Sequence, residues 1–434
     1  MDVLNILLLI MAANQPIRLA YDSKDDSFWW KYPVREIFLE AADKFVREVG
    51  GKVKIWAASR DWFMEEWGRD TFISLPGILL VPGKFKEARE VIENFAGHMR
   101  NGLIPNRIPE GKEAEYNTAD APMWFIQAVK SYFEYTKDTE FTVSMIPVLE
   151  EIIRAYKNGT GYERFGGMQA IKMDEKDCLI INPSQSTWMD ADPSGKGLSV
   201  VTPRNGKCVE INALWYSNLR FTAALLRHAH NSPKAREYNL IADKVRISFN
   251  AEFWNTPERA LFDVIEGDEH GGAIRPNMLF AVSHGGDLLS PVKQAAVFDC
   301  ARKDLLTPGG LRTLSPRDSN YKGTYDTSLP MEQKDMAYHQ GTAWPWLMGT
   351  YCDSLAKVKK IQGIDTSRIR LEIAQVVGPL VRFCIESPHR SLPEVFSGSE
   401  PYEPGGTRSQ AWSIAEVLRV LDKFKITELK ARTK

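Results

Sequence analysis

Two acidic residues in long loops have the type and setting for acid–base chemistry. The first, Asp190, stands in the segment STWMDAD (186 to 192), close to Trp188 and to a second acid, Asp192. Burial beside these apolar side chains would raise the pKa of Asp190, as a general acid requires. Asp192 precedes a proline and is more typical of a turn residue. A purely structural role, in which either aspartate caps a turn, stays open.

The second candidate is Glu394, which lies between apolar residues in the segment LPEVFSG (392 to 398), shortly before the last expected helix. In an inverting glycosidase a protonated acid serves the leaving oxygen, while an ionised carboxylate about 6.5 to 9.5 Å away activates water. Two loops at one end of a helical toroid could present Asp190 and Glu394 in this way. Because glutamates are mostly exposed, a solvated loop role for Glu394 is the alternative.

Tryptophans beside polar groups indicate what such a pair would act on. The chain has 12 tryptophans, and Trp67, Trp188 and Trp344 lie close to charged or amide side chains rather than in apolar runs. A pyranose has apolar C–H faces that stack on an indole and hydroxyls that pair with carboxylates, amides and guanidinium groups. The pattern favours a carbohydrate cleft, although core packing explains any single tryptophan equally well.

Further polar residues stand where expected helices meet loops. Asp70 and Asp120 are also suited to capping a helix, whereas a guanidinium among aromatic residues, such as Arg69, usually has a planar partner. The residues predicted to bind substrate are Trp67, Arg69, Asp70, Asn106, Asn117, Asp120, Trp188, Arg204, Glu210, His339, Gln340, Trp344 and Gln410.

Twelve amphipathic helices are expected to position these residues. Apolar side chains recur at helical spacing in segments that end at Gly, Pro, Asn or Asp. The expected helices are 34–48, 70–80, 84–101, 118–137, 141–157, 209–230, 234–254, 276–284, 290–306, 339–360, 365–387 and 408–424. Long irregular segments lie between some of them, at 158–208, 307–338 and 388–407, and part of 165–182 alternates like a short hairpin. Strands and helices do not alternate, so we predict an all-α fold, an (α/α)6 toroid with long loops on one face.

Composition and charge indicate which classes of molecule the protein is expected to bind. The 434 residues include 55 basic and 56 acidic ones, and this near-neutral balance favours neither nucleic acid nor an anionic membrane. Nucleotide-binding, zinc-protease and serine-hydrolase motifs are absent from the sequence. Five widely spaced cysteines are typical of a reducing compartment, and we expect a cytoplasmic protein. The sequence does not indicate an oligomeric state.

The ends of the chain are expected to lie outside the toroid. The apolar stretch from Val3 to Met11 is too short to span a bilayer and follows Asp2 rather than a basic residue, which disfavours a signal peptide. We interpret residues 1–33 as an N-terminal extension or the remnant of an upstream domain, 34–425 as one toroid domain, and 426–434 as a basic tail.

The chain resembles the amylo-α-1,6-glucosidase half of glycogen debranching enzymes in eight ordered motifs, which together span nearly all of 60–420. They are WGRDTFISLPGILL, GLIPNRIPEG, YNTADAPMWF, STWMDA, TPRNGKCVEINALWY, RPN, YHQGTAWPW, and EVFSG with SQAWSIAE. The resemblance implies an (α/α)6 toroid and inverting hydrolysis of the α-1,6-linked glucose at a trimmed glycogen branch. Asp190 would be the general acid and Glu394 the general base, and the mechanism requires no metal or organic cofactor.

The chain also departs from that family. Only about 60 residues precede the first motif, so the glucanotransferase activity of the eukaryotic enzymes is not expected, and the stretch from Asp61 to Glu66 is irregular against the family. Three alternatives remain open. They are another toroid hydrolase of the glucoamylase or trehalase type, a disaccharide phosphorylase, and a glucan-binding protein without catalysis.

Overall fold

The structure is a computed structural model that describes residues 28–58, 65–194, 200–267 and 269–429. The apolar stretch from Val3 to Met11 lies outside the described residues, as does most of the irregular stretch that begins at Asp61. None of the helices within the described ranges is long and apolar enough to cross a membrane. All five cysteines fall in these ranges and are free thiols.

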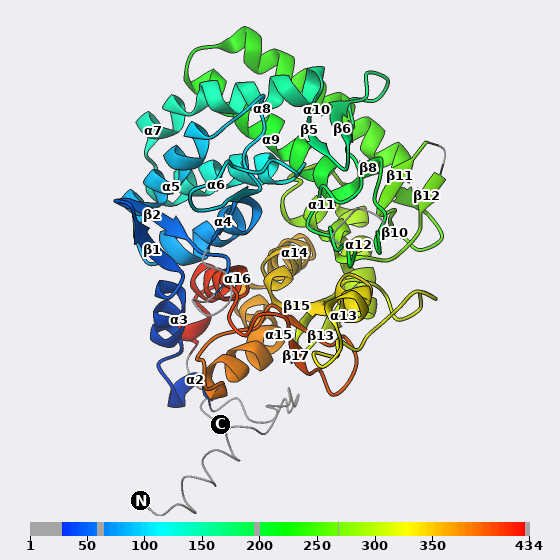
Figure 1. Cartoon of the computed structure of the whole chain (residues 1–434). Coiled ribbons are helices and arrows are strands. Elements are labelled where there is room, and N and C mark those ends of the chain that lie inside the picture. The colour runs from blue at the N-terminus through cyan, green and yellow to red at the C-terminus, as the bar shows by residue number, and fades with distance from the viewer. Residues whose placement is uncertain (1–27, 59–64, 195–199, 268, 430–434) are drawn as a thin grey trace, which may run out of the picture.

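Six helices form a closed inner ring, in which each helix contacts the next and the last contacts the first (Figure 1). Both the inward and the outward faces of these helices are buried, so the helices are apolar on most sides. In α9, for example, fifteen residues are buried. The ring consists of α4 (Gly68–Leu75, continued by the π-helix η1, Pro76–Leu80), α6 (Ala121–Thr136), α9 (Val209–His228), α11 (Leu279–Ser283), α14 (Met348–Ile361) and α16 (Ala411–Lys423).

An outer layer of helices alternates along the chain with the inner ring, and each outer helix packs on inner ones. An outer helix buries only one stripe: α8 buries Ile146, Leu149, Ile153 and Tyr156, at the spacing of one helical face. The outer layer consists of α3 (Val34–Asp43), α5 (Phe85–Gly97), α7 with α8 (Thr139–Ser144, Ile146–Asn158), α10 (Ser232–Glu252), α12 (Pro291–Leu305) and α15 (Thr366–Glu386). The predicted (α/α)6 toroid is therefore confirmed.

Short antiparallel strands connect the loops at the mouth where the inner helices begin. The loop before α16 joins the loop before α14 in a five-stranded sheet: β13 (Leu306–Thr307), β14 (Gly310–Arg312), β15 (Ala343–Trp344), β16 (Val395–Phe396) and β17 (Pro404–Gly405). Elsewhere β3 (Glu66–Trp67) pairs with β4 (Arg107–Ile108), and β8 (Lys207–Cys208) with β11 (Val264–Glu266), which also pairs with β12 (Glu269–Gly271). A smaller pair is β9 (Trp254–Asn255) with β10 (Ala260–Leu261). These pairings bring loops far apart in sequence to one side of the ring.

The expected hairpin within 165–182 is present as β5 (Thr160–Arg164), β6 (Gly167–Met173) and β7 (Ile180–Ile181). Three expectations were wrong in detail. The helix expected over 34–48 ends at Asp43, and a hairpin of β1 (Val46–Val49) and β2 (Lys52–Ile55) follows, because Gly50 and Gly51 adopt positive φ and reverse the chain.

The segment 307–338, expected to be irregular, contains a helix, α13 (Met331–Tyr338). Ala337 is its only buried residue, so the sequence carries no apolar periodicity there. The helix expected to begin at 339 begins instead with a 3-10 turn, η3 (Pro345–Leu347), because β15 occupies the preceding residues. At the other end a short turn, η4 (Ile426–Glu428), lies in the segment expected to be a tail, and its Ile426 is buried.

Candidate active site

A cavity of about 200 Å³ lies at the mouth of the toroid where the inner helices begin. Arg69 and Asp70 line it from the first turn of α4, and Gln410 lines it from the position before α16. Nine of the predicted site residues line this cavity. They are Trp67, Arg69, Asp70, Trp188, Asp190, His339, Trp344, Glu394 and Gln410.

Asp190 is held at the cavity by a guanidinium. Arg69 donates from Nη1 to Asp190 Oδ2 at 3.1 Å and from Nε to Asp120 Oδ2 at 2.6 Å, so one cation joins two carboxylates. Asp120 also accepts a hydrogen bond from Thr118 Oγ1 at 2.7 Å and does not cap α6 with its side chain. The Asp190 side chain keeps 32% of its surface exposed, which leaves it accessible to a ligand.

The carboxyl groups of the cavity hold protons more strongly than free ones. Burial raises the pKa of Asp190 above its ordinary value, although Arg69 offsets part of the rise. Burial also raises the pKa of Asp70, to about 7 against the attraction of Arg69, and the neighbouring charges of Glu394 and Asp190 add to the rise. Three carboxyl groups therefore share one cavity near a single guanidinium, and a proton retained among them at neutral pH is the expected state.

Glu394 is held as a hydrogen-bond acceptor. Its Oε1 accepts from the Tyr338 hydroxyl at 2.6 Å and its Oε2 from the Thr407 N–H at 3.1 Å. Burial raises the pKa of Glu394, whereas these two hydrogen bonds lower it. Gly406 makes the arrangement possible: it has φ +67°, and a Cβ there would lie 2.2 Å from Glu394 Oε2. Glu394 thus has a fixed orientation, and the two hydrogen bonds offset part of the rise in its pKa, which stays above the ordinary value.

A polar chain links Glu394 to Asp70. Thr407 donates from its hydroxyl to Gln410 Oε1 at 2.7 Å, and Gln410 donates from Nε2 to Asp70 Oδ1 at 3.4 Å. Aromatic rings form another wall: Trp188 makes an edge contact with Trp344 at 5.4 Å between centroids, and His339 stacks on Trp344 at 5.5 Å. Burial, together with nearby arginines, lowers the pKa of His339 far enough to keep it neutral. The cavity combines flat apolar faces with convergent polar groups.

The structure places the other predicted residues outside this cavity. Asp120 lies behind Arg69, and Asn106 accepts from the Gly68 N–H with its backbone oxygen, at 2.8 Å. Asn117 lines a separate groove with Tyr162 and Arg164. Gln340 is engaged by Arg275, which donates to its Oε1 at 2.7 Å. Arg204 and Glu210 pair with each other in the interior.

Arg204 and Glu210 form a buried ion cluster with Asp263. Arg204 is 2% exposed, and it donates from Nη2 to Glu210 Oε2 at 2.6 Å and from Nε to Asp263 Oδ2 at 2.7 Å. Its Nη1 also donates to Thr187 Oγ1 at 3.0 Å, three residues before Asp190. The position of the cluster indicates that it holds the Asp190 loop rather than a ligand.

A second connection from the same cluster reaches Trp188. Asp263 Oδ1 accepts from Asn277 Nδ2 at 2.8 Å, and Asn277 Oδ1 accepts from the Trp188 indole N–H at 2.8 Å. Thr187 and Trp188, which precede Asp190 in this loop, are therefore both fixed by buried polar contacts. Elsewhere in the loop Asp192 Oδ1 accepts from the Ser194 N–H at 3.1 Å, so Asp192 forms the expected turn.

Replacing Arg204 by Met should destabilise the fold strongly. The change leaves the carboxylate of Glu210 buried without its cation and leaves Asp263 only the longer contact with Arg275, at 3.8 Å, which costs about 3–5 kcal/mol of unfolding free energy. Urea denaturation followed by circular dichroism measures it. The matched control is Arg154→Met, which removes the exposed pair with Glu151 and should change stability little. Equal, small losses in both variants would contradict a structural role for the buried cluster.

Some residues of the cavity were not predicted. Tyr338 directly precedes His339 but lies at the end of α13, which the sequence pattern did not indicate. Thr407 and Trp412 flank the predicted Gln410 and line the cavity beside it, although neither was singled out. Ala57 and Ala58 line the cavity without any polar group that could have indicated them. Asp263 stood outside every motif. The sequence indicates Asp263 only indirectly, because a buried Arg204 needs more than one anionic partner.

The chain is similar to sequences of known glycoside hydrolases. The family described as amylo-alpha-1,6-glucosidase matches residues 39–419. The chain is 30% identical over 373 residues to the glycogen debranching enzyme of Saccharomyces cerevisiae, covering 67% of the chain but only 24% of that enzyme. It is also 24% identical over 421 residues to the trehalase of Bombyx mori, covering 83% of the chain and 67% of that protein. The chain thus spans about a quarter of the length of the yeast enzyme.

A solved structure shares the fold. The GH63 mannosylglycerate hydrolase from Thermus thermophilus, solved in complex with glucose, superposes with a TM-score of 0.64 over 89% of this chain and 99% of that one. The sequences are 13% identical, so the likeness concerns the architecture alone.

Proposed function

The chain belongs to the amylo-α-1,6-glucosidase family and is a glycoside hydrolase, and on this basis we propose that it releases glucose from the α-1,6 branch stubs of glycogen-like glucans. The observation that carries the proposal is the meeting of Asp190 and Glu394, from two separate loops, in one aromatic-walled cavity. Carboxyl groups and aromatic faces together suit a pyranose.

In the proposed reaction Asp190 is the general acid and Glu394 the general base. Asp190 gives its proton to the glycosidic oxygen as the bond from that oxygen to the anomeric carbon breaks. Glu394 accepts a proton from the water that attacks the same carbon from the opposite face. The products are β-glucose and a glucan with a free hydroxyl. The raised pKa of Asp190 and the donors on Glu394 support this division of roles.

Two side chains that line the cavity have buried donors without a partner, and other lining groups suit a sugar directly. Arg69 Nη2 and His339 Nε2 have no hydrogen-bond partner among the described residues. Neutral His339 accepts from the Ala191 N–H through Nδ1, at 3.4 Å, so its proton is on Nε2. Both donors are fully buried and become available only when the lining moves. A terminal glucose in the cavity would meet the carboxyl of Asp70 and the indoles of Trp188 and Trp344.

A second candidate function is hydrolysis of trehalose. The similarity to the trehalase of Bombyx mori covers more of this chain than the similarity to the yeast enzyme. Trehalose also presents a terminal glucose, and the two candidates therefore differ in the leaving group rather than in the catalytic carboxylates.

A substrate panel separates these candidates. Glucose release is measured from phosphorylase-limit dextrin, isomaltose, maltose and trehalose, and the first anomer formed is followed by NMR. Release of β-glucose mainly from limit dextrin is the expected result. Preferred turnover of trehalose would keep the hydrolase and change its substrate. First formation of α-glucose from limit dextrin would contradict inversion, whereas trehalose gives one α- and one β-glucose by inversion. Binding of glucan without any glucose release would indicate a glucan-binding protein.

Replacing Tyr338 by Phe should move the acidic limb of the pH profile. The change removes the donor that lowers the pKa of Glu394. That pKa therefore rises, the base is protonated at higher pH, and activity on the acid side is lost at higher pH than in the wild type. The measurement is kcat/KM against pH on the preferred substrate.

The matched control is Tyr351→Phe, because the Tyr351 hydroxyl is buried without a hydrogen-bond partner among the described residues and does not line the catalytic cavity. Its acidic limb should coincide with that of the wild type. An unchanged acidic limb in Tyr338→Phe as well would show that Glu394 is not the group titrating there.

A further inference from the structure

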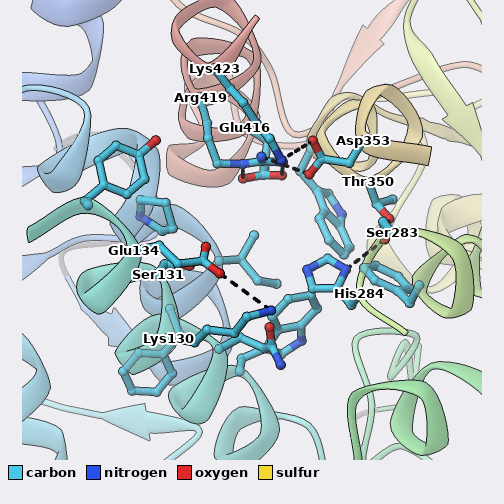
Figure 2. A pocket seen from close by; sticks show the side chains of 18 of the residues that line it. Lys130, Ser131, Glu134, Ser283, His284, Thr350, Asp353, Glu416, Arg419 and Lys423 are labelled. Carbon is cyan, nitrogen blue, oxygen red and sulfur yellow. Dashed lines mark hydrogen bonds and ion pairs between the residues drawn. The ribbon is translucent and has the colours of Figure 1, made fainter. Parts of the chain in front are cut away.

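A second cavity, of about 550 Å³, lies in the toroid at the mouth opposite the catalytic cavity (Figure 2). Its polar walls come from later turns of the inner helices, such as Lys130 in α6 and Arg419 in α16, whereas the catalytic cavity uses their beginnings. Arg419 follows Gln410 by nine residues, which is about 14 Å along a helix. The proposed reaction uses none of these polar wall residues.

The floor of this cavity is aromatic. Trp124, Phe280 and Trp346 line it and contact one another, with ring centroids 5.5 Å apart for Trp124 and Phe280 and 5.9 Å for Phe280 and Trp346. Trp346 is 2% exposed, and its indole N–H has no hydrogen-bond partner among the described residues. The indole N–H is itself buried, so the residue meets the cavity through its ring. The floor therefore offers flat apolar faces.

The charged side chains of the walls neutralise one another. Four cations line the cavity, Lys130, Arg419, Lys423 and Lys425, and so do four anions, Glu134, Asp353, Glu416 and Asp422. Each is paired, as Figure 2 shows for most of them. The N–O distances are 3.8 Å for Lys130–Glu134, 3.0 Å for Arg419–Asp353, 2.7 Å for Arg419–Glu416, 2.7 Å for Lys423–Asp353 and 3.5 Å for Lys425–Asp422. A charged ligand would have no uncompensated partner here.

The remaining wall groups are neutral. Burial lowers the pKa of His284 to about 3, and its Nδ1 is hydrogen-bonded to the Ser283 hydroxyl at 2.8 Å. The hydroxyl of Ser131 also lines the cavity. Gly349 lets the ion pairs pack closely, because a Cβ there would lie 1.5 Å from Glu416 Oε2. The wall is thus a fixed, neutral array of hydrogen-bond donors and acceptors above an aromatic floor.

We propose that this second cavity binds a neutral mono- or disaccharide. The sugar's C–H face would lie on the aromatic floor, and its hydroxyls would pair with the ion-paired side chains, which keep unused donors and acceptors. An inorganic anion or a metal cation lacks the apolar face that this floor suits. The inference does not depend on which glycosidic bond the catalytic cavity cleaves.

The two cavities share an aromatic partition, so a binding experiment has to separate them. Trp346 stacks on Trp412 at 5.0 Å and makes an edge contact with Trp188 at 5.2 Å, and both of these residues line the catalytic cavity. The catalytic cavity can be occupied with 1-deoxynojirimycin, a cationic glucose analogue suited to its carboxylates. The neutral second cavity has no corresponding preference for a cation.

Equilibrium dialysis with labelled glucose tests the proposal on the full chain. With saturating 1-deoxynojirimycin the wild type should still bind one glucose per chain. Ser131→Trp, which fills the cavity, should weaken this binding at least tenfold, whereas Ser131→Ala should leave it within about threefold. Glu134→Trp, at an exposed position of the same wall, provides a second blocking variant should Ser131→Trp not fold.

Several outcomes would overturn the proposal. They are the absence of inhibitor-insensitive glucose binding, retention of that binding in a folded blocking variant, and its displacement by inorganic phosphate. Unchanged catalytic turnover in Ser131→Trp confirms that a loss of binding is local. Comparing glucose binding by the Trp and Ala variants tests the second cavity even when the catalytic cavity binds no inhibitor. A failure of the proposed function can therefore be told apart from a failure of this proposal.

Discussion

Asp190→Asn should lower kcat for the preferred glucan on the order of 10²- to 10⁴-fold, the contribution expected of a general acid. The amide has nearly the same shape but cannot protonate the leaving oxygen. KM should change little, because the groups expected to grip the sugar, including Arg69 and His339, are unaltered. Steady-state kinetics on the substrate selected by the panel gives both constants.

A substrate whose leaving group needs little protonation tests whether the loss of activity is specific to proton transfer. Fluoride leaves glucosyl fluoride without full protonation, so Asp190→Asn should keep far more activity on α-glucosyl fluoride than on the glucan. Asp192→Asn is the matched control, since Asp192 forms a turn with Ser194 in the same loop. Equal losses on both substrates would show that Asp190 serves binding or loop geometry rather than proton transfer.

Much of the fold follows from periodic burial. Outer helices such as α8 bury one stripe at helical spacing, and the sequence shows that stripe directly. Cap and breaker residues then bound the helices to within a few positions. The ring itself is less local, because contact of α16 with α4 joins segments separated by most of the chain. It was predicted from the number of paired helices and from the family resemblance.

The candidate site was predictable where a residue's chemistry is unusual for its setting. An acid between apolar residues in a loop, as Glu394 is, carries its own signal. Arg204 carried a signal too, but the sequence could not show that Glu210, Asp263 and Thr187 would engage its donors in the interior. A buried cation and a ligand-binding cation look alike until their neighbours are known.

Residues that act through a partner had no signal. Tyr338 matters because it lies 2.6 Å from Glu394, and that contact depends on an exposed helix whose sequence lacks an apolar stripe. The second cavity had no sequence signal for the same reason. Lys130 and Lys423 both line it although nearly 300 residues separate them in the chain. Each of these charged residues alone is typical of an exposed helix position, and only the closed ring brings them together.

Glu394→Gln should abolish hydrolysis, with kcat lowered on the order of 10²- to 10⁴-fold. The amide oxygen can accept from the Thr407 N–H, and the Tyr338 hydroxyl can turn to accept from the amide NH2. The loop should therefore keep its geometry while losing the base that activates water. Glu400→Gln, at an exposed position in the same loop, is the matched control and should behave as wild type. Substrate binding by the inactive variant, measured by dialysis with limit dextrin, should persist.

Added phosphate distinguishes a hydrolase from a phosphorylase at this residue. In a phosphorylase the phosphate itself attacks the anomeric carbon, and the reaction needs no base for water. Glu394→Gln would then keep near-normal turnover in phosphate buffer and form glucose 1-phosphate. In the hydrolase proposed here phosphate restores nothing, because no group remains to accept the proton of the attacking water. Phosphate-dependent turnover in this variant would therefore show that the enzyme is a phosphorylase, in which Asp190 still acts as the acid.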